Sequence, residues 1–399
     1  MALRVIVSGA GIAGLALAYW LHKLGASTLV IERSAHFQPL GHYLSLKGNG
    51  VEVVRRMGIL DACQARAAAI EETRMYSQRG RLLRSEPTAE MNRLLGGYIL
   101  LRRADLQAAL YELAREHAEF RFGRQIGKVQ LGESGVDVTL NDGELVSADL
   151  LIGADGIHSQ VRDLVWGTGF TRPLGGHYIA VTQALRHGLT RATHSYWGRG
   201  RMLSLFAVSE DSVSSVAYLE ASAGTPPRHD APAMRDYLLA ISQGFPDHVR
   251  QILGQLGSDD FVFADVIAQI VMPRITARRC ALVGDAAHCP TFLSGMGSSL
   301  ALQGALLLAN CLESSPADVP AALARYEQAI TPIAQRYQHS ALRMRGLVLG
   351  RSRVKGALRN LALRSLPQCW VQNSLRRFFD AERPLHESAA APSDSASAS

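Results

Sequence analysis

The residues best suited to chemistry gather in the stretch ALVGDAAHCP, residues 281–290, where Asp285, His288 and Cys289 lie within five positions. Such a group is compatible with a Cys/His nucleophile, with metal ligands or with part of a cofactor site. His288 and Cys289 lack a second thiol or a supporting Asp at useful spacing, so we interpret them as loop and packing residues. Asp285 follows an apolar strand, at the edge where open α/β sheets bind ligands. Asp285 is therefore the functional candidate of this stretch.

A glycine loop and a long apolar helix follow this strand, in the segment PTFLSGMGSSLALQGALLLA. Gly295 and Gly297 leave backbone N–H groups free at the start of the helix, which suits a phosphate or a partly anionic ring. We therefore predict that residues 281–299 form one part of a binding site for a long cofactor.

The N-terminal segment LRVIVSGAGIAGLALAYWLHKLGASTLVIER indicates a strand, a glycine turn, a helix and a second strand. Gly9 permits the tight turn, Gly11 lets the backbone approach a pyrophosphate, and Gly14 lets helix and strand pack closely. Glu32 stands 18 residues after Gly14, where its carboxylate can bind both hydroxyls of an adenosine ribose. The alternative is a glycine turn without a ligand. NAD and FAD are equally compatible with this motif.

A third segment, ADLLIGADGIHSQVR, places Asp155 after another apolar strand. Its carboxylate could contact a ligand at the strand end, or it could cap the following helix. A single dinucleotide that reaches two strand ends would account for all three segments.

Composition indicates an ordinary globular enzyme, because 47% of the 399 residues are hydrophobic and 19% are charged. The odd number of scattered cysteines predicts reduced thiols, a cytoplasmic setting and no metal site: Cys63, Cys280, Cys289, Cys311 and Cys369. We expect neither signal-peptide cleavage nor a membrane span, since glycines interrupt the N-terminal apolar run and LALQGALLLANCL is too short. The net charge of +7 comes largely from arginines in residues 336–379, which we interpret as a solvated helical face or a cover over an anionic cofactor. No motif for nucleic-acid binding is evident.

The order of patterns predicts an α/β fold in which a Rossmann-like nucleotide-binding domain is interleaved with a smaller mixed-sheet domain. We assign the first, discontinuous domain to residues 1–69, 97–174 and 271–322, and the substrate-binding domain to residues 70–96 and 175–270. A C-terminal helical segment is expected over residues 323–380 and a disordered Ser/Ala-rich tail over residues 381–399. The oligomeric state is expected to be a monomer or a homodimer.

These motifs, in this order, resemble the single-component FAD-dependent aromatic hydroxylases of the p-hydroxybenzoate hydroxylase type. Glu32-Arg33, GADG, GDAAH and LRRADL, which contains Arg103, match the family over roughly residues 3–330. DDFVFADVIAQIVMPRITARRCALVGDAAHCP and GHYLSLKGNG look most similar to the tetracycline-inactivating and polyketide-hydroxylase branch. Thr291, Phe292, Met296 and Ser299 depart from it, because many relatives have Pro, Pro, Gln and Asn there.

The resemblance implies that Glu32 holds the adenosine ribose, that Arg33 lies near the adenine, and that Asp285 binds the ribityl chain. Arg103 would contact the ribityl or phosphate portion, and Asp155 would support FAD or a transiently bound NADPH. The expected cofactor-binding residues are Gly9, Gly11, Ile12, Ala13, Gly14, Glu32, Arg33, Lys47, Arg103, Asp155, Asp285, Pro290, Gly295, Gly297 and Ser298.

The resemblance also implies the reaction: NADPH or NADH reduces FAD, O₂ forms a flavin hydroperoxide, and one oxygen passes to an aromatic, phenolic or polyketide-like substrate. No universal acid or base is needed, so the catalytic residues stay unknown. A pocket between the flavin and the second sheet would be lined by Tyr196, Trp197, Met202, Phe206 and Tyr218. The alternatives are a non-oxygenating flavoprotein of the same fold, such as a reductase or dehydrogenase, and a cofactor-binding regulator. The tryptophans lack the W-x-W-x-I-P pattern of halogenases.

Overall fold

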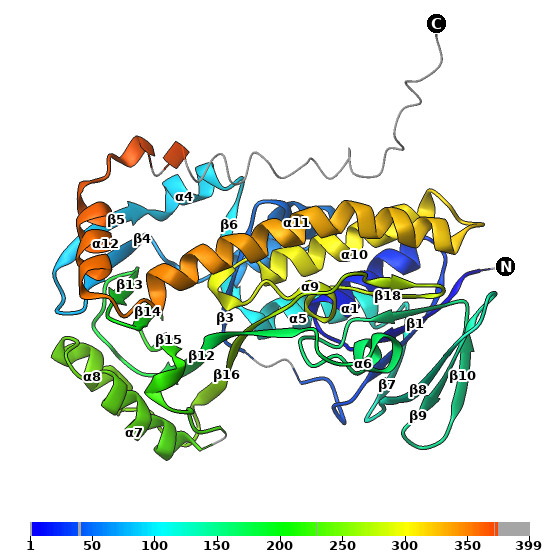
Figure 1. Cartoon of the computed structure of the whole chain (residues 1–399), viewed down its shortest axis with the longest axis horizontal. Helices are drawn as coiled ribbons and strands as arrows, with labels where there is room; N and C mark the ends of the chain where they lie inside the picture. Colours follow the sequence, from blue (N-terminus) through cyan, green and yellow to red (C-terminus); the bar gives the residue numbers. More distant parts are fainter. Residues whose placement is uncertain (1, 39–40, 229, 371, 374–399) are drawn as a thin grey trace, which may run out of the picture.

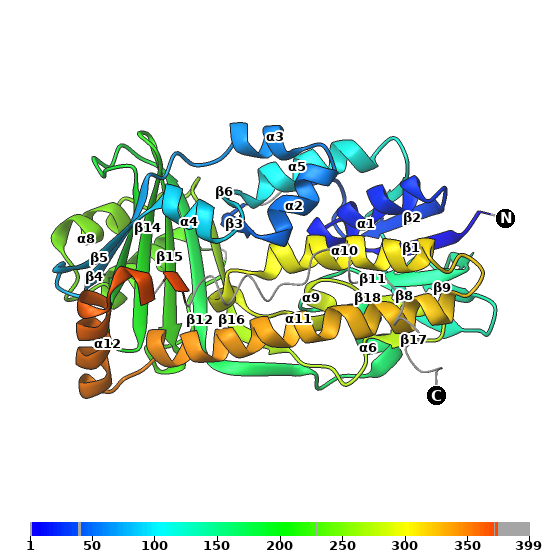
Figure 2. The ribbon, with the colours of Figure 1, turned by 90° about the horizontal axis from the view of Figure 1, so that it is seen from above.

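The computed structural model describes residues 2–38, 41–228, 230–370 and 372–373. The expected tail over residues 381–399 lies outside the described residues. A parallel sheet with its helices occupies the end of the molecule near the N-terminus, and a second large sheet occupies the other end (Figures 1 and 2). Helix α11 (Val319–Val348) runs along the molecule between them. The predicted combination of an α/β unit with a separate mixed sheet is confirmed.

The first sheet has six strands, and its central strands are short apolar runs that are buried side by side. Its order is β17-β18-β11-β1-β2-β7, and all neighbours are parallel except the pair β17 and β18. Val5, Ile6 and Val7 of β1 are at most 1% exposed, as expected for a central parallel strand. The strands are β1 (Arg4–Ser8), β2 (Ser27–Glu32), β7 (Glu119–Phe122), β11 (Leu150–Gly153), β17 (Thr276–Ala277) and β18 (Cys280–Leu282).

The second sheet has seven strands in the order β16-β12-β15-β14-β13-β4-β5. All its neighbours are antiparallel except β13 and β4. Tyr178 pairs with Tyr218, and Tyr218 pairs with Met202, so these three side chains lie in one row on one face. The strands are β4 (Glu72–Ser77), β5 (Leu82–Pro87), β12 (Thr171–Ala184), β13 (Ala192–Trp197), β14 (Arg201–Ser209), β15 (Ser212–Glu220) and β16 (Phe261–Ile270).

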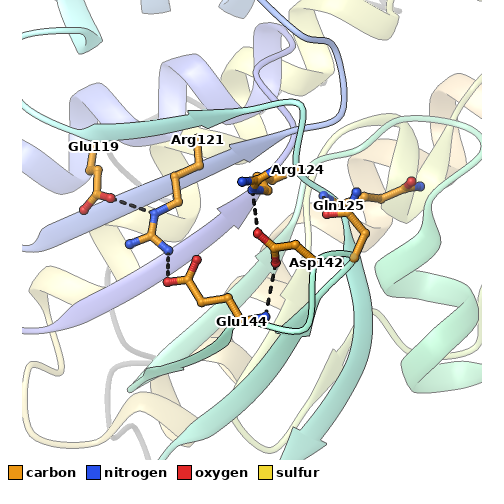
Figure 3. A network of polar contacts seen from close by, with 7 residues as sticks. Glu119, Arg121, Arg124, Gln125, Asp142 and Glu144 are labelled. Atoms are coloured by element: carbon orange, nitrogen blue, oxygen red, sulfur yellow. Dashed lines mark hydrogen bonds and ion pairs between the residues drawn. The ribbon is translucent and has the colours of Figure 1, made fainter.

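Two small sheets complete the strands. One pairs β3 (Tyr43–Lys47) with β6 (Tyr98–Arg102), and the other joins β8 (Ile126–Leu131), β9 (Val136–Leu140) and β10 (Leu145–Ala148). The Asn-Asp-Gly sequence at residues 141–143 predicts a hairpin turn, and it connects β9 and β10 in the structure. Figure 3 shows how ion pairs attach this hairpin to β7: Arg121 contacts Glu119 and Glu144, and Arg124 contacts Asp142. Such exposed pairs each contribute about 0–1 kcal/mol, so we interpret the network as a surface support.

Helix α11 connects the two ends of the molecule through buried hydrogen bonds. Gln338 donates to Ile270 O over 2.7 Å, and Tyr326 donates to Leu282 O over 3.1 Å. The other helices are α1 (Ile12–Lys23), α2 (Asn49–Arg56), α3 (Leu60–Ala65), α4 (Thr88–Leu94), α5 (Arg103–Ala114), α6 (Gln160–Trp166), α7 (Ala231–Ile241), α8 (Asp247–Gly254), α9 (Asp285–His288), α10 (Gly297–Glu313) and α12 (Arg353–Ser365), with short 3₁₀ turns at Ala221–Ala223 and Phe292–Ser294. Within the described residues, no helix has the length and apolar character to cross a membrane.

Candidate functional site

The glycine turn between β1 and α1 is held by close backbone packing. Gly9 has φ +106°, and a Cβ there would lie 2.7 Å from Ala154 O. A Cβ at Gly14 would lie 1.9 Å from Gly9 O, so any larger residue at position 14 would force the backbone to move. At Gly11 the nearest atom to such a Cβ is 4.0 Å away, on Arg103. Gly9 and Gly14 are thus required by the fold, whereas Gly11 leaves room beside the loop.

The N-terminus of α1 is open to an anion. Gly11 is its N-cap, no side chain caps the first turn, and that turn carries no acidic residue. Ile12 and Ala13 are buried in the same turn, so it is fixed in place. Free N–H groups at a rigid helix start attract phosphate.

Glu32 lies at the end of β2, as predicted, and its carboxylate faces the glycine turn. One oxygen accepts a hydrogen bond from the Ala10 N–H over 2.8 Å, and the other accepts from the Ser34 N–H over 2.9 Å. Arg33 is exposed. The Glu32 carboxylate is therefore part of the turn, whereas the Arg33 side chain lies outside it.

Arg103 and Asp285 converge on this turn from two other elements. Arg103 begins α5, and its backbone N–H donates to His42 O over 2.9 Å. Burial lowers the pKa of the Arg103 guanidinium, while the charges of Asp285 and Glu32 oppose that change. Burial likewise raises the pKa of Asp285, and Arg103 opposes it. A cation thus interacts electrostatically with two carboxylates that are far apart in the sequence.

Asp155 acts on the protein itself. Its carboxylate accepts hydrogen bonds from the Ser159 hydroxyl, from the Gln160 N–H over 2.8 Å and from the Val161 N–H over 3.1 Å. These contacts cap α6, which is the alternative that the sequence left open. Arg162 of α6 in turn donates to Ala286 O over 3.3 Å. The Asp-Gly segment therefore positions the segment that carries Asp285, and the expected support of FAD or NADPH by Asp155 stays a prediction.

The second glycine loop leads into the N-terminus of α10. This helix, like α1, has no side-chain cap and no acidic residue in its first turn. A Cβ at Gly297 would lie 3.7 Å from the Asp285 carboxylate, so the loop and the acid are neighbours. Pro290 is buried at the start of the loop, and Ser298 is half-buried in the first turn of α10. Two open helix starts thus flank the region of Arg103 and Asp285.

Lys47 reaches the second loop from β3. A Cβ at Gly295 would lie 2.9 Å from the Lys47 ammonium, and Gly295 has φ +61°. The Lys47 nitrogen also lies 6.0 Å from the centre of the Tyr98 ring. Burial lowers the pKa of Lys47 to about 8, and no carboxylate pairs with it in the described residues. An anionic group would be well placed beside it.

The four departures from the family pattern have distinct structural roles. Thr291 adopts φ +74°, an unusual conformation for a residue with a side chain. The Ser299 hydroxyl accepts the Lys47 backbone N–H over 3.0 Å, and so ties α10 to β3. Met296 is 1% exposed. Phe292 stacks on Tyr178, with ring centres 3.9 Å apart. The conformation of the loop is therefore stabilised by contacts of the side chains at these four positions.

His288 and Cys289 do not form a nucleophilic pair. Both His288 ring nitrogens are buried without a hydrogen-bond partner among the described residues. Burial raises the pKa of the Cys289 thiol well above its usual range and lowers the pKa of His288 to about 4. An activated thiolate needs the opposite shift. No group of His, Cys, Asp or Glu in the described chain could hold a metal.

An aromatic cluster joins the second loop to the seven-stranded sheet. We define this aromatic cluster as His42, Tyr178, Tyr218, Phe263 and Phe292. Its rings contact one another at centre distances between 3.9 and 6.3 Å. The Tyr218 hydroxyl donates to Phe292 O over 3.3 Å. A wall of aromatic side chains therefore adjoins the loop of α10.

The sequence placed the second sheet beside the cofactor but did not resolve its two faces. Trp197, Met202, Phe206 and Tyr218 pack in one cluster with Phe292. The expectation for Tyr196 was wrong, because Tyr196 packs on the opposite face against α7 and α8 and hydrogen-bonds His248 at 2.7 Å. Sequence reasoning missed His42, Tyr178 and Phe263. The alternation in GGHYIAVTQ was the available signal for Tyr178, because it sets the faces of β12.

A family model described as FAD binding domain matches residues 2–341. The chain belongs to this FAD-binding family. A flavin-dependent monooxygenase from an unknown prokaryotic organism is 31% identical over 346 residues, which cover 84% of this chain and 87% of that protein. The predicted resemblance to FAD-dependent hydroxylases is thus confirmed.

Two solved structures share the fold. The tetracycline destructase Tet(55) is 25% identical with a TM-score of 0.78, over 96% of this chain and 98% of that chain. Klebsiella pneumoniae HpxO, complexed with FAD and uric acid, is 24% identical with a TM-score of 0.84, over 94% and 96% of the two chains. The chain is thus a flavoprotein of the FAD-dependent monooxygenase family.

Proposed function

We propose that this protein is an NAD(P)H-consuming FAD monooxygenase that inserts one atom of O₂ into an aromatic, phenolic or polyketide-like small molecule. One observation carries the proposal: two open helix N-termini, those of α1 and α10, flank the Arg103 cation and the Glu32 and Asp285 carboxylates. Separate anion sites with carboxylates between them match a long molecule that alternates phosphates with polyhydroxyl groups.

The residues fit FAD along its length. The start of α1 would hold the pyrophosphate, Glu32 the adenosine ribose and Asp285 the ribityl hydroxyls. Arg103 would lie against the pyrophosphate and ribityl portions, since its guanidinium lies 4.0 Å from a Cβ built at Gly11 and interacts electrostatically with both acids. The α10 start and Lys47 would face the anionic part of the ring, because both present positive charge at the same loop.

Bound FAD would supply the redox chemistry, in which O₂, a hydride from NADPH or NADH and one proton yield one inserted oxygen atom and one molecule of water. The chain contributes a dry, apolar site. The aromatic cluster lies at the end of the loop that would hold the ring, so a planar substrate stacked there would be shielded from water.

Aromatic substrates are favoured by the walls of this site. Tyr178, Phe263 and Phe292 offer ring faces and edges, which suit a planar ring. His42 and the Tyr178 hydroxyl add polar groups with no protein hydrogen-bond partner in the described residues, and these could bind a phenol or enol oxygen. The two structural neighbours, a tetracycline destructase and an HpxO complexed with FAD and uric acid, are consistent with a polar aromatic or polycyclic substrate.

The test is a substrate screen on the purified holoenzyme. We expect phenols or polycyclic enols to stimulate NADPH or NADH oxidation together with O₂ uptake, and ¹⁸O₂ to label the product with one oxygen atom. Flavin reduction without any labelled product would instead support a non-oxygenating flavoprotein. Failure of every aromatic ligand to accelerate flavin reduction would refute the monooxygenase proposal.

A matched pair of variants tests the position of the substrate. Tyr178→Phe removes a hydroxyl from the aromatic cluster, and Tyr196→Phe removes one from the opposite face of the sheet. We expect KM for the substrate to rise roughly fivefold or more only in Tyr178→Phe, the size of one lost hydrogen bond. Equal effects in both variants would contradict this placement.

A further inference from the structure

Helix α12 exposes a stripe of large apolar side chains. Val354, Leu358 and Leu361 are 69%, 59% and 58% exposed, and they follow one another at spacings of four and three residues. At about 100° per residue, this spacing places all three within an arc of about 60°. We call these three residues the apolar stripe. Exposed apolar groups gathered on one helix face mark an interaction surface more often than scattered ones do.

The orientation of α12 is fixed by contacts of its other face. Arg359 donates to Trp197 O over 3.3 Å and lies 5.2 Å from the centre of the Trp197 ring. Arg84 of β5 donates to Leu366 O over 3.1 Å, just after the helix. The helix lies at the outer edge of the seven-stranded sheet in both views (Figures 1 and 2). The apolar stripe therefore points away from the protein.

Cations border the apolar stripe on both sides. On a helical projection Lys355 falls to one side, and Arg353 and Arg364 fall to the other. All three are exposed, and none has a carboxylate partner in the described residues. The sequence from 328 to 379 contains ten Lys and Arg residues and no Asp or Glu, so its charge exceeds the net +7 of the whole chain. Trp370, 67% exposed, follows the helix.

We propose that the face of α12 docks on an anionic lipid membrane surface. An apolar stripe flanked by Lys and Arg fits the boundary between acyl chains and headgroups, because the stripe enters the hydrocarbon edge while the cations reach anionic headgroups. Trp370 suits the same interface. The helix would lie flat, since its 13 residues are too few to span a bilayer.

The charge of the segment favours an anionic membrane over a second copy of the chain, and the apolar stripe favours it over a nucleic acid. A second copy of the same face would bring like charges together, and no acidic residue is present in that segment to offset them. A nucleic acid would use the cations and leave the apolar stripe in water. An anionic bilayer alone engages both chemistries of the face.

Vesicle flotation of the full-length holoenzyme tests the proposal. We expect flotation with vesicles of equal parts phosphatidylglycerol and phosphatidylcholine, little with phosphatidylcholine alone, and a loss of binding as salt is raised. Tryptophan emission should shift to the blue on binding in the wild type, and less in Trp370→Phe. Absence of flotation with the anionic vesicles at low salt would refute the proposal.

Two pairs of variants separate the apolar and ionic parts. The double variant Leu358→Ser/Leu361→Ser should weaken vesicle binding roughly tenfold, whereas Leu145→Ser, at a site 64% exposed in β10, should leave it unchanged. Lys355→Gln should weaken binding more than Lys128→Gln, an exposed lysine of β8. Every variant should retain bound FAD.

Three results would contradict the proposal that the face of α12 docks on an anionic membrane. Equal binding to neutral and anionic vesicles would remove the electrostatic part of the proposal. Unchanged binding of the double serine variant, together with retention on heparin, would indicate a polyanion site. Concentration-dependent dimers that disappear in the same variant, without flotation, would indicate a contact between copies.

Discussion

The two glycine loops that approach the proposed cofactor site are built in different ways. In the loop before α1, a Cβ at Gly14 would meet the backbone oxygen of Gly9 at 1.9 Å. In the loop before α10, a Cβ at Gly295 would meet two side-chain atoms, the end of the flexible Lys47 side chain at 2.9 Å and the Ser45 hydroxyl at 3.7 Å. The first loop is set by the main chain and the second by side chains. We infer that the first is the rigid anchor of the cofactor and that the second tunes its surroundings.

The largest effect is expected from Gly14→Ala, because the main chain at Gly9 cannot yield without displacing β1 and α1. We expect a loss of at least about a hundredfold in FAD affinity, or failure to fold, since overpacking a close backbone contact costs several kcal/mol. The measurement is the ratio of flavin to protein absorbance, with the melting temperature. Gly346→Ala in α11 meets nothing within 4 Å and should be neutral or stabilising. Normal FAD content in Gly14→Ala would contradict the inference that the first loop is the rigid anchor of the cofactor.

Asp285→Asn tests the carboxylate that lies beside both the second loop and Arg103. If Asp285 binds the ribityl chain as proposed, the change removes a charge-assisted hydrogen bond worth about 1.5–3 kcal/mol, so FAD affinity should fall roughly tenfold to a hundredfold. Fluorescence titration of apoprotein with FAD measures it. Asp247→Asn, in the first turn of α8 and far from the loops, serves as the control. Unaltered affinity in Asp285→Asn would reject its assignment as a cofactor ligand.

Lys47 should make FAD binding depend on pH. Its pKa of about 8 means that the ammonium is present below pH 8 and is lost above it. If the ammonium faces an anionic part of the cofactor, the FAD dissociation constant should rise up to about tenfold between about pH 7 and about pH 9. His42 and His288, with pKa values of about 3 and about 4, do not titrate in this range.

The same titration of Lys47→Met and Lys47→Arg provides the comparison. Lys47→Met should bind FAD weakly with no inflection near pH 8. Lys47→Arg keeps the charge throughout, so it should bind with an affinity that does not change with pH. An inflection that survives in Lys47→Met would show that another group is responsible.

Gly295→Ala should have the smallest effect. The Lys47 side chain can move aside, and the main cost is the left-handed conformation at φ +61°, about 1 kcal/mol. We expect FAD affinity to fall by roughly fivefold or less, with the melting temperature nearly unchanged. A loss as large as that in Gly14→Ala would mean that both loops are equally rigid, and the contrast would disappear.

The sequence predicted the elements that rest on local pattern. The turn from Gly9 to Gly14, Glu32 at the end of β2 and the hairpin at residues 141–143 follow from glycine placement and strand periodicity, and the structure has them where expected. Asp155 was ambiguous because a carboxylate after a strand has the same sequence pattern whether it caps a helix or binds a ligand. Its three hydrogen bonds to residues of α6 became visible only in the fold. The division into domains and the cofactor contacts of all the expected site residues stay predictions.

Sequence alone established the α/β class and placed Glu32 and Asp285 at strand ends, because short-range periodicity and glycine geometry are local properties of the chain. Arg103 was named only through the resemblance to the FAD-dependent hydroxylases. Only the tertiary structure decided which side chains meet. Residues 42, 178, 218, 263 and 292 gather because three strands pair in one register and a loop packs against them. It also turned Tyr196 to the other face and left the apolar stripe of α12 uncovered. Pairing register and helix docking depend on contacts between distant segments, and no local pattern encodes them.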